Sequence, residues 1–69
     1  MGWNLTDDRL PIGTILRGPH PVSREMVEVK ITQAWDDQRV LTLTSSGRDL
    51  ARDSVTKILS CGFKVTEAL

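Results

Sequence analysis

A stretch of alternating polarity at residues 26–46 constrains this chain more than any other feature. In its first half, apolar or bulky side chains occupy every second position and polar ones the positions between, which is the pattern of a half-buried β-strand. The set predicted to face inward is Val27, Val29, Ile31, Gln33 and Trp35. Beyond residues 36–38, Leu41 and Leu43 resume the alternation. The stretch therefore predicts a β-hairpin against which the remaining chain packs.

The length of the loop between these strands decides which residues face each other. A three-residue loop at residues 36–38 pairs Trp35 with Arg39. It also pairs Ile31 with Leu43, so the apolar side chains of both strands share one face. A four-residue loop would turn the leucines of the second strand to solvent, because a one-residue slip moves every side chain across the sheet. We therefore predict the three-residue loop.

Glycine and proline define a loop before the hairpin. Residues 13–17 predict a short strand, which ends at the sequence Gly-Pro-His-Pro of residues 18–21. Two prolines fix two φ angles and remove two backbone donors, which favours a rigid, exposed loop. We expect His20, at its tip, to be solvated.

The first residues predict a capped lead-in to the sheet. Thr6 is placed to cap a helical turn, and Pro11 ends it. We expect Trp3, Leu5 and Leu10 to fold back onto the sheet.

The segment after the hairpin allows two interpretations. In one, residues 48–50 pair with the preceding strand and a helix begins at Asp53. In the other, a single helix covers residues 49–61. Both share helix over the segment DSVTKILSCG of residues 53–62, with Gly62 at the left-handed position that follows the helix. Asp53 is a good N-cap for the helix that begins there.

Residues 63–66 alternate once more and predict a closing strand with Phe63 and Val65 inward. Four short strands and one small helix need two packed layers. We therefore predict a mainly β (α+β) fold in a single domain, residues 1–69. The small open barrel of the SH3-like kind fits this length best, and the alternative is a curled antiparallel sheet with the short C-terminal helix across one face.

The length of 69 residues leaves little core to stabilise the chain. A domain of about 60 residues buries only about 60% of the surface that its unfolded chain exposes. Cys61 is the only cysteine, so an internal disulfide is impossible, and Cys61 with His20 falls short of the four ligands of a structural zinc site. Pairing with a second copy, a homo-oligomer, is the remaining source of stability that we consider.

The charge balance bears on partners and location. Nine Lys and Arg residues match nine Asp and Glu residues, which argues against a general polyanion binder. No apolar run approaches the ~20 residues of a membrane span, and the first residues do not resemble a signal peptide. We expect a cytoplasmic protein without membrane contact.

No group of residues in the sequence predicts catalysis. Nucleophilic catalysis needs a nucleophile beside a base, and Cys61 with His20 is the only Cys–His pair, divided between a helix end and a distant loop. We expect Cys61 to be a buried apolar filler. The glycine-rich patterns that bind phosphates are missing. We expect no enzymatic activity, no metal site and no cofactor.

The arginines of the second half are the candidate binding residues. They are Arg39, Arg48 and Arg52, and arginine forms planar, two-point contacts with carboxylates and phosphates. With Trp35 as its cross-strand neighbour, Arg39 forms either a platform for a base or a cation–π contact that caps the hairpin. Neighbouring aspartates favour local neutralisation of these arginines.

Three short motifs resemble a known segment. They are PIGTILRGP at residues 11–19, VEV at residues 27–29 and a segment ending in TSSGRD at residue 49. Together they resemble the small β-rich segment that precedes the motor domains of some SNF2-type helicases, although His20 stands where that pattern has an aromatic residue. The resemblance implies an accessory module near a nucleic-acid machine.

Two functional hypotheses follow. The first is a non-catalytic protein-interaction module, a small adaptor or inhibitor, that uses the arginines with Trp35 and the apolar outer positions Met26 and Val40. The alternative is a nucleic-acid-associated accessory domain with an arginine face. Salt dependence separates them, because phosphate contacts weaken steeply as salt rises.

Overall fold

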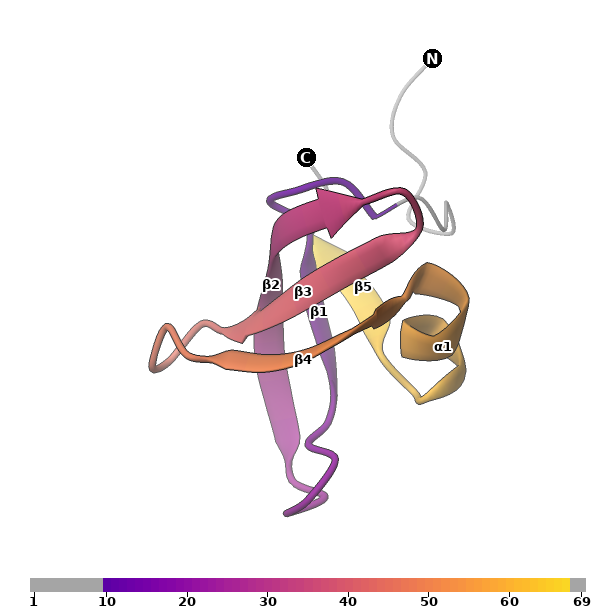
Figure 1. The fold of residues 1–69 in the computed structure, drawn as a ribbon. Helices are drawn as coiled ribbons and strands as arrows, with labels where there is room; N and C mark the ends of the chain where they lie inside the picture. The colour runs from indigo at the N-terminus through magenta and orange to yellow at the C-terminus, as the bar shows by residue number, and fades with distance from the viewer. Residues whose placement is uncertain (1–9, 68–69) are drawn as a thin grey trace.

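The computed structural model describes residues 10–67, which form one antiparallel sheet and a short helix (Figure 1). The elements are β1 (Ile15–Pro19), β2 (Met26–Trp35), β3 (Gln38–Leu43), β4 (Asp49–Ser54), α1 (Val55–Ser60) and β5 (Lys64–Glu67). The strand order is β4-β3-β2-β1-β5, so α1 carries the chain from one edge of the sheet to the other. The predicted mainly β fold is confirmed as an open, curled sheet consistent with a small barrel.

The hairpin of β2 and β3 forms, but its predicted register is wrong. A two-residue turn at Asp36 and Asp37 pairs Trp35 with Gln38, and Ile31 pairs with Leu41. The two pairings fit together because β2 carries an extra residue between Ile31 and the next paired position. Such a β-bulge shifts the alternation by one residue and bends the strand.

The alternation of side chains between the two faces of the sheet shifts by one residue at the bulge in β2. Before it, Val29 and Ile31 are buried as predicted. After it, Gln33 and Trp35 are exposed on the outer face of the sheet, although the alternation predicts them to face inward. The inward prediction therefore holds only up to Ile31.

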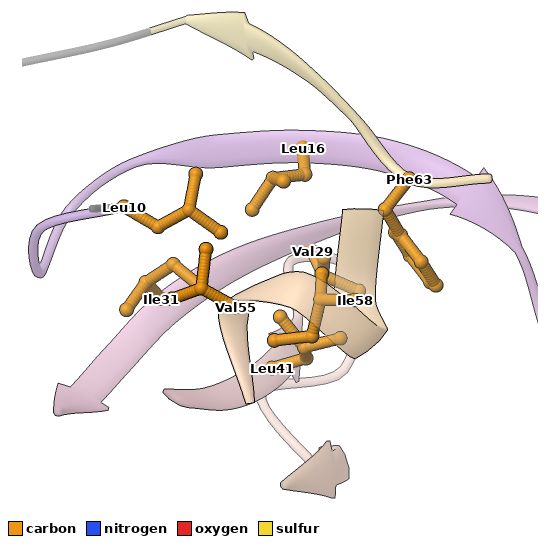
Figure 2. Close-up of a cluster of buried hydrophobic side chains, with 8 residues drawn as sticks. All are labelled: Leu10, Leu16, Val29, Ile31, Leu41, Val55, Ile58 and Phe63. Atoms are coloured by element: carbon orange, nitrogen blue, oxygen red, sulfur yellow. The ribbon is translucent and has the colours of Figure 1, made fainter. Parts of the chain in front are cut away.

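The core lies on the concave face of the sheet, with α1 packed across it (Figure 2). Its buried members are Leu10, Leu16, Val29, Ile31, Leu41, Val55, Ile58 and Phe63. The predicted inward positions of Leu10 and Phe63 are confirmed, and Val65 packs against the core while partly buried. The expectations for Trp3, Leu5 and Thr6 concern residues outside the described range.

The strand-then-helix interpretation of the second half is correct, with different boundaries. β4 extends to Ser54, and Ser54 rather than Asp53 caps α1, because its side-chain oxygen accepts the N–H of Lys57 at 3.2 Å. Asp53 remains in the sheet as the partner of Arg39. Gly62 has φ +102° directly after the helix, as predicted.

β1 runs two residues further than predicted, through Gly18 to Pro19. Gly18 is buried against Phe63, and a Cβ atom at this position would lie 2.6 Å from Cδ2 of the ring. The glycine is therefore needed for close packing and does not end the strand. In residues 10–67 the helix has six residues, and no helix is long and apolar enough to cross a membrane.

Candidate functional site

An exposed tryptophan and an arginine meet on the outer face of the sheet. Trp35 is 48% exposed, and the guanidinium carbon of Arg52 lies 5.4 Å from the centre of its ring, within cation–π distance. Val40 of β3 pairs with Gln33 on one side and with Arg52 on the other, so Arg52 reaches Trp35 across β3.

These residues surround a shallow hollow of about 360 Å³. We call Gln33, Trp35, Val40, Leu50 and Arg52 the outer-face patch. The predicted aromatic–arginine pair is thus present, with Arg52 in place of Arg39.

Arg39 lies on the inner face and is only 9% exposed. Its Nε–H donates to the carbonyl of Leu10 at 2.7 Å. Its Nη1 donates to the carbonyls of Asp36 at 2.7 Å and Gln38 at 2.8 Å. The predicted Trp35–Arg39 cross-strand contact is therefore wrong, because the bulge leaves the two side chains on opposite faces. Arg39 ties the lead-in segment to the β2–β3 turn.

The other candidate binding residues do not join the outer-face patch as one surface. Arg48 is exposed next to the β3–β4 turn, and Met26, 57% exposed, begins β2 at the end opposite Trp35. Val40 is an outer-face residue, as predicted, but it is 6% exposed and lies beneath its neighbours. The arginines are thus separated, with Arg52 alone beside Trp35.

A second hollow, of about 390 Å³, opens where the sheet ends at β4. We call it the edge cavity. Its walls come from the loop after β1, from β4 and from α1, and its floor is formed by Leu41, Ile58 and Phe63 (Figure 2). Sequence reasoning missed this site, because the loop after β1 is distant along the chain from β4 and α1, which follow each other directly.

His20 organises one wall of the edge cavity. Its Nδ1 accepts the backbone N–H groups of Val22 at 3.0 Å and Ser23 at 3.2 Å. The backbone N–H of His20 donates to the carbonyl of Glu25, and the backbone carbonyl of His20 accepts the N–H of Arg24. The half-buried His20 therefore closes the loop, and the prediction of a solvated loop tip is wrong.

Cys61 lines the same cavity as His20, which corrects the prediction that the two lie far apart. Cys61 is also exposed, where a buried filler is predicted. The two backbone N–H groups occupy Nδ1 of His20, so in the neutral ring the proton is on Nε2, which cannot accept one from the thiol. Among residues 10–67, no three His, Cys, Asp or Glu side chains are grouped to hold a metal ion.

Comparison with family models, curated proteins and solved structures finds no match to this chain.

Proposed function

We propose that this protein is a non-catalytic protein-interaction module and that the outer-face patch is its contact surface. The observation that carries the proposal is the exposed Trp35 with Arg52 held over its ring. Tryptophan and arginine are enriched among the residues that dominate binding energy at protein interfaces. Because Arg52 is already stacked, less side-chain freedom is lost when a partner binds.

The charge of the chain supports a protein partner. Positive and negative side chains balance over the whole sequence, and the hollow of the outer-face patch is bordered by Asp49 as well as Arg52. A surface of mixed charge with an aromatic centre suits a polar and aromatic protein interface. A small adaptor or inhibitor is the role that we assign to it. A cytoplasmic setting belongs to the proposal, since reducing compartments keep an exposed thiol such as that of Cys61 free.

A nucleic-acid accessory role is the second candidate, and the same pair favours it. A base can stack on an exposed tryptophan while arginine contacts its face or a phosphate. This role would agree with the resemblance of residues 11–19 to the segment before SNF2-type motors.

Affinity capture from the cells that produce the protein tests the first candidate. The parent is compared with the double variant Trp35→Gln, Arg52→Gln and with Arg17→Gln, which changes an exposed arginine of β1 outside both hollows. We expect the parent and Arg17→Gln to retain one partner that the double variant loses, while all three melt at similar temperatures. Equal capture by all three proteins would contradict the proposal.

Binding to labelled single-stranded DNA, RNA and duplex DNA tests the second candidate. We expect no measurable duplex binding at physiological salt. Micromolar binding that weakens steeply with salt and is lost in the double variant would instead favour the nucleic-acid role.

A further inference from the structure

The edge cavity lies over the core of the curled sheet. Ala51 of β4 pairs with Leu41, whose side chain belongs to the core, and both residues line the cavity. β4 is the last strand at this edge of the sheet in the described chain. The cavity therefore lies between β4 and the loop after β1. Its accessible apolar wall comes from Pro19, Pro21, Ala51 and Cys61, above the nearly buried Leu41, Ile58 and Phe63.

The rim of this apolar cavity carries an excess of positive charge. Arg24 from the loop and Lys57 from α1 both line it, against one carboxylate, that of Asp53. One oxygen of Asp53 already accepts the backbone N–H of Ser54 at 2.9 Å. An apolar floor beneath two cationic groups suits a ligand that is apolar at one end and anionic at the other.

The backbone of Arg24 is held in a conformation that an arginine rarely adopts. Its φ is +66°, a left-handed region that residues with a Cβ atom disfavour. The hydrogen bonds around His20 fix the loop in this shape. Such strain gathers at ligand sites, where it holds a side chain in place before the ligand arrives.

We propose that the edge cavity is a binding site for an apolar carboxylate, independent of the outer-face patch. The hydrocarbon group packs against Pro19, Pro21 and Ala51, above the buried core. The guanidinium of Arg24 donates to both carboxylate oxygens, the geometry that arginine favours. Lys57 adds a second positive charge at the rim. The volume of about 390 Å³ lies within the usual range of ligand pockets, and it accommodates a branched aliphatic acid or the last residue of a peptide.

Titration of the isotope-labelled protein, followed by amide NMR shifts, tests this proposal with two probes and their neutral partners. The probes are isocaproate and the peptide acid acetyl-Ala-Ala-Leu, and the neutral partners are the corresponding amides. We expect at least one acid to shift the signals of Arg24, Ala51 and Lys57, with a Kd about 10-fold or more below that of its amide. Binding of isocaproate alone identifies a small acid as the ligand, and binding of the peptide alone identifies a chain terminus. Failure of both acids to saturate below about 10 mM, or equal binding of acid and amide, would overturn the proposal.

Three variants test whether the acid binds in the edge cavity. Arg24→Asn removes the guanidinium and retains a residue that tolerates positive φ, so we expect a folded protein whose affinity for the acid falls about 10-fold. Ala51→Phe fills the cavity from an exposed position and should abolish binding; because Ala51 also borders the hollow of the outer-face patch, Arg24→Asn is the variant that assigns the site. Arg17→Gln, outside the cavity, should leave the affinity unchanged. Acid binding by Arg24→Asn as tight as that of the parent would refute the assignment.

Discussion

Replacing Arg39 with methionine should destabilise the protein more than any change at the exposed arginines. The variant retains an unbranched apolar side chain but removes the donors to the carbonyls of Leu10, Asp36 and Gln38. The bond to Leu10 is buried, and an unsatisfied buried acceptor costs about 1–3 kcal/mol. The other two bonds are partly buried, and water can partly replace them, so we assign each about 0.5–1 kcal/mol.

The sum is about 3 kcal/mol, a large share of the roughly 3–10 kcal/mol expected for the unfolding of a chain of this length. Urea unfolding followed by circular dichroism measures the change. With an m-value near 1 kcal/mol/M, typical of small proteins, the midpoint should fall by about 3 M. Arg39→Lys should lie between parent and Arg39→Met, because one ammonium cannot copy the planar fork of donors.

Arg52→Met is the matched control. Arg52 is exposed and stacks on Trp35, so its loss should cost less than about 1 kcal/mol. If Arg39→Met changes the free energy of unfolding by less than about 1 kcal/mol, or no more than Arg52→Met, then Arg39 does not hold the lead-in segment as described.

Three further changes test other parts of the fold. Thr14→Val should raise the free energy of unfolding by about 1 kcal/mol, because the buried Thr14 hydroxyl has no hydrogen-bond partner within residues 10–67. Thr14→Ser keeps the hydroxyl and should bring no gain in the same urea assay. A valine variant less stable than the parent would show that the hydroxyl is bonded. His20→Ala should speed hydrogen exchange of the backbone amides of Val22 and Ser23. His20→Asn keeps an acceptor atom bonded to Cγ and should preserve the protection of both amides. Equal exchange in the two variants would mean that Nδ1 of His20 does not hold these amides. Sedimentation equilibrium should reveal a dimer that forms with rising protein concentration, since β4 and β5 present free edges in the described sheet. A monomer at every concentration would contradict the proposed self-association.

Sequence periodicity predicts much of this fold where local pattern and tertiary packing agree. The buried positions Val29 and Ile31, the helix before Gly62 and the inward Phe63 all follow from spacing that one element sets by itself. The bulge does not, because a strict alternation of side chains contains no extra residue. One signal was present: Thr32 and Gln33 are consecutive polar residues, as a bulge that places both on the outer face requires.

The candidate sites were less predictable than the fold. The sequence predicts an arginine beside Trp35, but the predicted partner, Arg39, depends on a register that one extra residue in β2 alters. The edge cavity unites Arg24, Asp53 and Lys57 from three segments. Asp53 and Lys57 lie four residues apart at the junction of β4 and α1. The loop that carries Arg24 meets this junction only in the folded sheet, so its place at the site has no counterpart in local spacing.

The pairing of β5 with β1 has a consequence for the order in which the protein folds and opens. Tight turns join β2, β3 and β4, whereas β5 must return to β1 from the far end of the described chain. Contacts between distant residues cost more loop-closure entropy, so the three-stranded meander can form before β5 docks. We therefore expect β5 to be the first strand to detach in local unfolding of the folded protein. Because Phe63 directly precedes β5 and forms part of the cavity floor, such opening dismantles the edge cavity and leaves the outer-face patch intact.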